Sequence, residues 1–444
     1  METSAEFLNK LIETAKKSGA DAADAICFDN ISVSASTRLG KIENIEQANS
    51  KGFGLRVIID QKQAIVSSTD MSSNSVNNLV EQAIAMAKLA PKDPYLTLAD
   101  KELQVQEPLD LNLFDDSIIQ TEDLIDCAKE AENAALKVNG ITNSEGANSS
   151  FSKSSITLST SNDFVKTYKT SSYNISVSVI SGSHLNMQTD YEFSSKRFFK
   201  DLDSPSNIGL MAANRALKKL NPKKIASQEL PIIFDPRVAK TLLANFASAI
   251  NGATIAKGVS FLANKLHEQV FSNNINIIDD PKILKGMNSR PFDAEGLEGS
   301  KKYLVKDGIL NNYLLDLRSA KQLNLKPTAN AVRGLSSNPA PSSSNLYLEN
   351  GDVSPTDLLS ATKKGLYITD LFGMGINIVT GDYSQGAFGF LIENGELTYP
   401  VSEITIAGNL QEMFQNITAC NDLEFKYGTN SPTILVNKMT VAGV

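Results

Sequence analysis

Residues 375–401 read GINIVTGDYSQGAFGFLIENGELTYPV, and residues 403–410 continue as EITIAGNL. Glycines punctuate the first part of this stretch, which is typical of a loop. The pair Asn394-Gly395 lies between two apolar runs and favours a tight hairpin turn. A further alternating run starts at Glu403. The stretch therefore predicts a glycine-rich loop, two strands joined by a hairpin, and a third strand.

The glycines of this loop allow a functional and a structural interpretation. Glycine has no side chain, so a backbone or an extended guest peptide approaches closely there, and neighbouring polar side chains supply hydrogen bonds. The candidate peptide-binding or interface residues, none of them a catalyst, are Gly381, Asp382, Tyr383, Ser384, Gly386 and Gly389. Alternatively, the glycines only form bulges and tight turns inside a sandwich of strands. Residue types alone leave both interpretations open.

The sequence around this stretch consists of short strand-like runs from Glu229 onward. Asp235-Pro236 predicts a helix start, because Asp caps helices well and Pro suits the first helical position. This helix is expected to run to Gly252. Residues 324–345 are poor in apolar residues and rich in Pro, Ser and Asn, which predicts a long exposed loop.

The first half of the chain repeats one layout twice. Thr3 and Glu6 form a capping box at the start of a helix that Gly19 ends. Alternating strands follow, and then a second helix that ends before Pro91. A helix over residues 121–138, more strands, and a helix starting at Ser204-Pro205 repeat the order. Two such units indicate a duplicated architecture.

These patterns predict an α+β protein with a duplicated helix–strands–helix N-terminal half and a strand-rich C-terminal domain. A chain of 444 residues exceeds one ordinary core, so several domains are expected. We expect an N-terminal α/β domain over residues 1–108, a central α/β domain over 109–225, and the strand-rich domain over 226–444.

Composition limits the classes of partner and the compartment. The net charge of −8 argues against a non-specific grip on nucleic acid or on an anionic membrane. No apolar run is long enough for a transmembrane helix, and the first residues lack the features of a signal peptide. The three cysteines, Cys27, Cys127 and Cys420, are widely spaced, which favours a reducing cytoplasm over a disulfide framework.

Familiar catalytic motifs are missing from the sequence. A zinc-peptidase helix needs two imidazoles and a carboxylate. His267-Glu268 begins such a motif, but Phe271 stands where the second imidazole is required. Ala387 replaces the lysine that a phosphate-binding loop needs, and no GxSxG elbow occurs. With only two histidines, nothing suggests a Ser-His-Asp triad, although residue counts do not rule one out.

The stretch at 375–410 closely resembles the signature of the PmbA/TldE side of the TldD/PmbA family, once named as modulators of DNA gyrase. Further motifs of that family occur in the same order. They are KGVSFL at 257–262, DDP at 279–281, PFDAEG at 291–296 and KMTVAG at 438–443. The resemblance covers about the last 200 residues, and the N-terminal layout is compatible with it.

The resemblance implies a mechanism in which zinc is held by a partner. In the TldD-type subunit the helix reads Leu-Leu-His-Glu with a second His after three further residues, and a later Cys is the third ligand. At the matching helix here, Leu242-Leu243 precede Ala244 and Asn245, and Ala249 stands at the second His. Cys420 lies near the third ligand but is offset, so we expect a small buried thiol.

The resemblance therefore predicts the non-catalytic subunit of a TldD/TldE-like zinc metalloprotease complex that hydrolyses small or unfolded peptides. We expect no metal in this chain, zinc in a TldD-like partner, and a possible homodimer when the chain is alone. One alternative is a divergent autonomous metallopeptidase that uses His267, Glu268, Asp293 and Glu295. Another is a regulatory binding protein linked to DNA gyrase. Its acidic charge weighs against direct contact with DNA.

Overall fold

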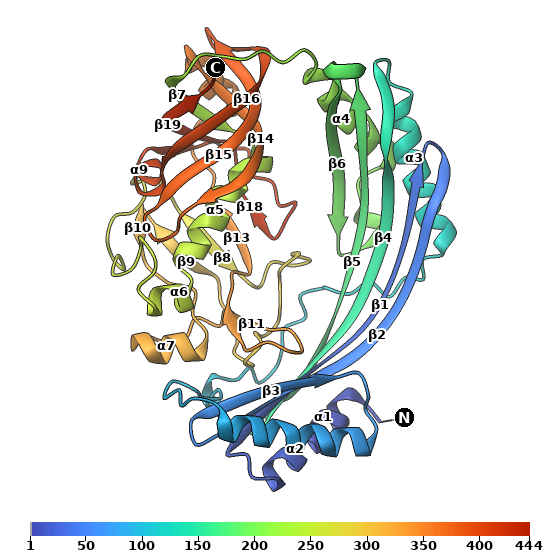
Figure 1. Ribbon diagram of the computed structural model, residues 1–444, viewed down its shortest axis with the longest axis vertical. Helices are drawn as coiled ribbons and strands as arrows, with labels where there is room; N and C mark the ends of the chain where they lie inside the picture. The colour runs from blue at the N-terminus through green and yellow to red at the C-terminus, as the bar shows by residue number, and fades with distance from the viewer. Residues whose placement is uncertain (1) are drawn as a thin grey trace.

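A computed structural model describes residues 2–444 and places the first half of the chain in one six-stranded sheet of order β3-β2-β1-β4-β5-β6 (Figure 1). The first unit comprises α1 Ser4–Lys17, β1 Ala22–Arg38, β2 Lys41–Ile59, β3 Lys62–Ser68 and α2 Ser73–Leu89. The second unit comprises α3 Thr121–Leu136, β4 Ile141–Thr160, β5 Val165–Ser181, β6 Gln188–Lys196 and α4 Pro205–Lys218. Short 3₁₀ helices span Lys101–Leu103, His184–Asn186 and Phe199–Asp201.

The duplicated layout predicted from sequence is confirmed, and the two units meet at the antiparallel pair β1–β4. The order helix, three strands, helix occurs in both. Each unit contributes three neighbouring strands, so the predicted segments 1–108 and 109–225 share a continuous sheet. The boundaries between the predicted segments stay predictions.

Local signals account for the helix that opens the chain. The Thr3 hydroxyl accepts a hydrogen bond from the Glu6 backbone N–H at 3.2 Å, and Glu6 Oε2 accepts one from the Thr3 N–H at 2.8 Å. This reciprocal capping satisfies two N–H groups that the first turn leaves free. Gly19 follows the helix with φ +102°, a left-handed conformation that glycine adopts without strain.

The four long helices cover one face of the N-terminal sheet. Ala23, Ala25 and Cys27 of β1 pack against α1 and α2, since alternate strand residues point to the same face. Helices α3 and α4 pack on β4 and β5 in the same way. A Cβ on Gly209 of α4 would lie 2.1 Å from the Ala131 carbonyl oxygen, so these two helices touch closely.

The two sides of α4 differ in burial. Ala213 is buried, whereas Leu210 is 42% exposed. The buried face is formed by small residues and Ile208. Small residues occupy this buried face because α3 and α4 approach each other too closely for a leucine side chain to fit between them.

The C-terminal half contains two sheets and a two-stranded ribbon. The six-stranded sheet has the order β16-β15-β14-β7-β19-β17, with β7 Gln228–Phe234, β14 Lys364–Ile376, β15 Asp382–Glu393, β16 Glu396–Asn409, β17 Ile417–Ala419 and β19 Ile434–Ala442. The five-stranded sheet has the order β10-β9-β8-β13-β18, with β8 Ile277–Asp280, β9 Lys302–Lys306, β10 Ile309–Leu310, β13 Asn345–Leu348 and β18 Thr429–Asn430. Strands β11 Ala331–Val332 and β12 Ala340–Pro341 form the ribbon. The helices are α5 Pro236–Ala249, α6 Gly252–Ala256, α7 Leu317–Leu323, α8 Pro355–Ala361 and α9 Leu410–Gln415.

The prediction of a long exposed loop over residues 324–345 is wrong in part: residues 324–326 and 336–338 are exposed, but residues 329–331 are buried. Strands β11 and β12 lie in this segment, which packs against the N-terminal sheet (Figure 1). A Cβ on Gly54 of β2 would lie 1.9 Å from the Leu335 carbonyl oxygen. Asn330 and Arg333 are buried; the Asn330 amide donates to Asp279, and one terminal nitrogen of Arg333 donates to Asp24. Hydrogen bonds and ion pairs thus hold these two polar residues in the interior, where apolar contacts usually hold a buried segment.

A buried ion network joins the two halves of the molecule. Asp24 of β1 pairs with Arg56 of β2 and with Arg333 from the segment between β11 and β12. Ile26 lies on the same face of β1 as Asp24 and joins a small apolar cluster with Phe292 of the C-terminal half. Within residues 2–444 no helix combines the length and the apolar character that crossing a bilayer requires.

Candidate functional site

The predicted peptide-binding segment is mostly a strand and not a loop. Gly381 has φ +83° and donates its N–H to the Asn377 carbonyl oxygen at 2.8 Å, which closes a turn. From Asp382 the chain runs as β15, paired with β14 on one side and β16 on the other. Repeated cross-strand pairing overrides the glycine pattern here, because both neighbouring strands satisfy the backbone groups of β15.

Side chains along β15 alternate between the core and solvent. Tyr383 is 2% exposed and lies in the main C-terminal core. Its hydroxyl is buried and finds no hydrogen-bond partner in the described residues 2–444, and burial raises its pKa above the ordinary value. Asp382 and Ser384 point to the exposed side. The expectation that Tyr383 offers a hydrogen bond to a guest therefore does not fit its position.

The glycines of β15 have different structural surroundings. A Cβ on Gly389 would lie 2.1 Å from the Tyr367 carbonyl oxygen of β14, so close strand pairing requires glycine at this position. A Cβ on Gly386 would lie 3.4 Å from Phe372 Cβ, which is ordinary contact. Packing alone thus explains Gly389, and it leaves the presence of glycine at position 386 unexplained.

Helix α5 carries the positions that the sequence analysis compared with a zinc helix. Asp235 caps it by accepting a hydrogen bond from the Arg237 N–H at 2.9 Å, and Pro236 follows. Ala244 is exposed, whereas Ala249 is completely buried at the helix end. The side-chain nitrogen of Asn245 is buried and makes no hydrogen bond within residues 2–444.

One turn before Ala244, the amine of Lys240 lies 3.2 Å from the centre of the Tyr427 ring. Burial, together with the nearby Arg237, lowers the pKa of Lys240 to about 8. Residues four apart share a helix face, so Ala244 and Lys240 point to the same side of α5. This face of α5 therefore carries a lysine packed against a tyrosine ring, and it has no imidazole at position 244.

Cys420 lies on the other side of the C-terminal sheet from α5. It packs with Ile233 of β7, whereas the neighbouring Ile232 and Phe234 pack against α5. Burial, with a smaller contribution from Asp422, raises the pKa of the Cys420 thiol to about 12. The predicted small buried thiol is confirmed. A thiol must lose its proton to bind a metal, and this environment opposes that loss.

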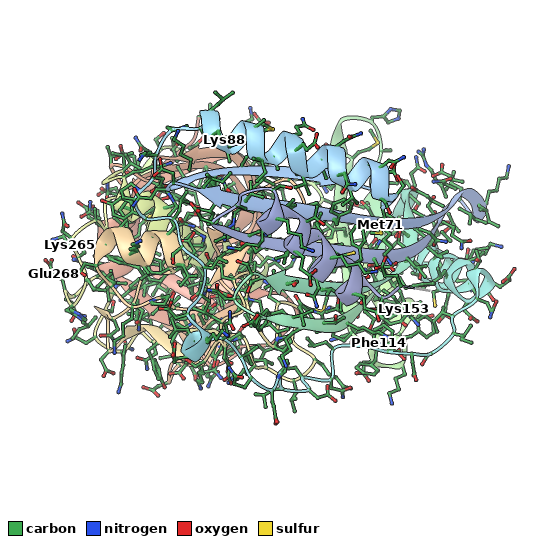
Figure 2. The ribbon with its side chains drawn as sticks, turned by 90° about the horizontal axis from the view of Figure 1, so that it is seen from below. Met71, Lys88, Phe114, Lys153, Lys265 and Glu268 are labelled. Atoms are coloured by element: carbon green, nitrogen blue, oxygen red, sulfur yellow. The ribbon has the colours of Figure 1, made fainter. Side chains whose placement is uncertain are left out.

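The four residues of the alternative metallopeptidase do not come together. His267 is exposed, and Glu268 forms an exposed ion pair with Lys265 at 2.7 Å, at one edge of the molecule (Figure 2). Asp293 and Glu295 are buried and accept backbone hydrogen bonds. Burial raises the pKa of both carboxyls. Among residues 2–444, no three His, Cys, Asp or Glu side chains are arranged to hold a metal ion.

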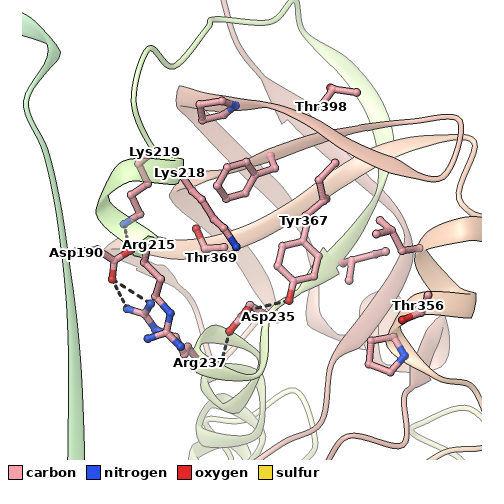
Figure 3. Close-up of a pocket in the computed structure, with 16 residues that line it drawn as sticks. Asp190, Arg215, Lys218, Lys219, Asp235, Arg237, Thr356, Tyr367, Thr369 and Thr398 are labelled. Carbon is pink, nitrogen blue, oxygen red and sulfur yellow. Dashed lines mark hydrogen bonds and ion pairs between the residues drawn. The ribbon is translucent and has the colours of Figure 1, made fainter. Parts of the chain in front are cut away.

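A pocket of about 640 Å³ lies between the N-terminal sheet and the C-terminal sheet (Figure 3). At its edge, Asp190 of β6 accepts hydrogen bonds from both terminal nitrogens of Arg237 at 3.0 Å. Lys219, directly after α4, pairs with Asp190 at 2.8 Å and with Asp370 of β14 at 2.9 Å. No motif in the sequence predicted this pocket. The one local signal was the basic last turn of α4, which also suits an ordinary helix end.

Comparison with known proteins identifies the family. Family models match residues 227–443 as the PmbA/TldA metallopeptidase C-terminal domain, 23–87 as domain 1, and 114–220 as the central domain. The chain belongs to the PmbA/TldD family. The resemblance found in the sequence is thereby confirmed, and it extends into the N-terminal half.

Relatives in the PmbA/TldD family match the chain along its length. The metalloprotease PmbA homologue of Haemophilus influenzae is 37% identical, covering 97% of this chain and 94% of that protein. Metalloprotease PmbA of Escherichia coli O157:H7 is 34% identical, covering 100% and 98%.

Solved structures from the PmbA/TldD family share the fold. The crystal structure of a putative modulator of DNA gyrase from Bacteroides thetaiotaomicron has a TM-score of 0.92, 28% identity, and full coverage of both chains. TldE from Thermococcus kodakarensis has a TM-score of 0.87 over 98% of this chain and all of that one. At 21% identity this second likeness speaks for the fold alone.

Proposed function

We propose that this member of the PmbA/TldD family is the non-catalytic subunit of a zinc metallopeptidase complex. A TldD-like partner would hold the zinc, and the complex would hydrolyse small or unfolded peptides. The odd number of cysteines and their wide spacing support a cytoplasmic location for the chain. The observation that carries the proposal is the composition of α5, where Ala244, Asn245 and Ala249 occupy the positions that the family resemblance gives to His, Glu and His.

The packing around α5 supports this proposal. Ala249 is fully buried, and the Ser260 hydroxyl donates to the Ala249 carbonyl oxygen at 2.6 Å. Overpacking a tight core costs about 1–3 kcal/mol. An imidazole at position 249 would therefore need rearrangement of the surrounding core. The sheet also separates Cys420 from α5. The two positions for histidine ligands are therefore alanines, and the cysteine near the third ligand position lies on the other side of the sheet.

For peptide contact we propose the exposed side of β15 and the turn before it. Asp382 and Ser384 point outward from the strand, whereas Gly381 is buried against the Asn409 side chain and Gly386 lies against Phe372. Asp382 already accepts a hydrogen bond from the Thr380 hydroxyl at 2.6 Å. Ser384 is therefore the better candidate to donate a hydrogen bond to a guest peptide or a partner subunit.

Reconstitution with a TldD-like subunit tests the proposal. The chain alone, the partner alone, and their mixture are compared for zinc by elemental analysis and for cleavage of an unstructured fluorogenic peptide. We expect zinc in the partner only, and full activity only in the mixture. About one zinc per chain in the isolated protein, lost on His267→Ala, would instead support the autonomous metallopeptidase.

A pull-down with the same preparation separates the regulatory alternative. Retention of DNA gyrase, with no retention of the TldD-like subunit and no gain of activity on mixing, would contradict the proposal. The wild-type chain and His267→Ala are expected to retain the TldD-like subunit equally, because His267 is exposed and lies outside the proposed contact residues.

A further inference from the structure

Within residues 2–444, the pocket between α4 and the C-terminal sheet has one basic side chain that forms no ion pair. Arg237 and Lys219 share Asp190, and Lys219 also pairs with Asp370. Arg215 pairs with Glu192. For Lys218, no ion pair and no hydrogen bond occurs within residues 2–444, and its side chain extends into the pocket toward Tyr367 (Figure 3). Three basic side chains of the wall are thus engaged, and Lys218 is available.

The rest of the wall combines hydroxyl groups with apolar surface. Thr356 of α8 and Thr398 of β16 line the pocket, together with Leu359, Phe390 and Leu397. Pockets of about 300–1,000 Å³ with apolar walls and a few convergent polar groups are typical of small-molecule sites. The volume of about 640 Å³ therefore suits a ligand of the size of a short peptide.

The charges around Lys218 select among anionic ligands. The Tyr367 hydroxyl donates to Asp235 at 2.8 Å, so this carboxylate stays on the wall of the pocket. Asp190 also lines the pocket, but Arg237 and Lys219 already compensate its charge. Because like charges repel, the Asp235 carboxylate disfavours a doubly charged phosphate, whereas Lys218 attracts a single carboxylate.

We propose that this pocket binds the C-terminal carboxylate of a short apolar peptide, with Lys218 as the residue that pairs with the carboxylate. The leucines and Phe390 receive the apolar side chain next to it, and the threonine hydroxyl oxygens accept hydrogen bonds from peptide N–H groups. The Thr398 hydroxyl donates to the Leu391 carbonyl oxygen at 3.1 Å and keeps its acceptor capacity. A simple fatty acid has no N–H group to donate to these oxygens. The inference does not depend on the proposed peptidase complex, because it concerns binding to this chain alone.

Calorimetry on the full chain, with N-acetyl-leucyl-leucine as the probe, tests the inference. The free acid is compared with its C-terminal amide, which lacks the charge. We expect the acid to bind about tenfold or more tightly than the amide, since charge-assisted hydrogen bonds are stronger than neutral ones. Lys218→Met is expected to remove that preference and to leave the affinity for the amide unchanged.

Lys137→Met is the matched control, since Lys137 is an exposed lysine at the end of α3 and does not line the pocket. It should bind both probes like the wild type. The inference is overturned if acid and amide bind equally, or if neither binds at millimolar concentration. Retention of the preference in Lys218→Met would overturn it too, as would tighter binding of decanoate or inorganic phosphate than of the peptide acid. A melting temperature equal to the wild type shows that each variant is folded.

Discussion

Arg333 and Asp24, 309 residues apart in the chain, form a buried ion pair that joins the C-terminal half to the N-terminal sheet. Arg56 donates to the other oxygen of the same carboxylate at 2.8 Å. Two guanidinium groups thus share one buried carboxylate. For Arg333, two further side-chain nitrogens are buried without a partner among residues 2–444, so Asp24 carries most of its compensation.

Asp24→Asn is therefore expected to destabilise the protein strongly. Removing one partner of a buried pair leaves uncompensated charge and typically costs about 3–5 kcal/mol. Urea unfolding measures the change. Asp29→Asn on the same strand is the control, because its pair with Lys51 is exposed and contributes about 0–1 kcal/mol. Equal losses for the two variants would contradict the role of the buried network.

The stability of the protein should depend on the protonation of Glu295. Burial, with the nearby Asp293 and Asp316, raises the pKa of this carboxyl well above 4.5. The folded protein therefore binds this proton more tightly than the unfolded chain does. The stabilisation that comes from this bound proton is complete below about pH 4.5. It is lost as the pH rises through the pKa that Glu295 has in the folded protein.

Glu295→Gln is expected to raise the free energy of unfolding at neutral pH and to flatten its pH dependence above about 4.5. Glutamine still accepts the hydrogen bond that the Leu317 N–H donates to Glu295 at 2.8 Å. Urea unfolding of both proteins between about pH 5 and 8 makes the comparison, a range chosen from the ordinary carboxyl pKa upward. A variant that is less stable than the wild type at every pH would refute the argument.

Tyr383→Phe should stabilise the chain or leave its stability unchanged. The Tyr383 hydroxyl is buried without a partner among residues 2–444, and an unsatisfied buried polar group costs about 1–3 kcal/mol. Activity of the reconstituted complex should not change, because the ring points into the core. Thermal unfolding and peptide cleavage are measured on one preparation. Lost activity with intact stability would instead give the hydroxyl a functional role.

Ser384→Ala should lower activity of the reconstituted complex without lowering the stability of this chain. The hydroxyl lies on the exposed side of β15, and a hydrogen bond to a guest is worth about 0.5–1.5 kcal/mol. The variant is compared with the wild type in peptidase rate per complex and in melting temperature. Unchanged activity would assign this segment a structural role only.

Reductant should not change the melting temperature. Cys27, Cys127 and Cys420 are all free thiols, and two of them are buried. Replacing all three by alanine should make no difference to this insensitivity, although the loss of the buried side chains lowers stability somewhat. A wild-type transition that falls by several degrees in reductant would reveal a disulfide bond.

Several features of the fold were predictable because their determinants are local. The capping box at Thr3 and Glu6, the start of α5 at Asp235-Pro236, and the Asn394-Gly395 turn each depend on neighbours in the chain. The repeated order of helices and strands follows from periodicity in the same way. The missing zinc-helix side chains were equally visible, since Ala244 and Asn245 are adjacent residues.

The candidate site was predictable only in part. The sequence drew attention to residues 381–389, but it did not reveal that Tyr383 faces the core while Ser384 faces outward. Which face of a strand is buried depends on what packs against it, and the partners of β15 come from β14, β16 and the core beneath them.

The sequence by itself determined the family, the duplicated order of elements, and the absence of His and Glu from the α5 positions, because each is written in adjacent residues or in short periods. Tertiary structure decided that Arg333, within the segment 324–345 predicted to be exposed, is buried, since Asp24 and Arg333 find each other only across the folded chain. It also decided that Lys218 faces a pocket formed with β14, β16 and α8. Long-range contacts place polar groups from distant segments together, and no local pattern encodes that proximity.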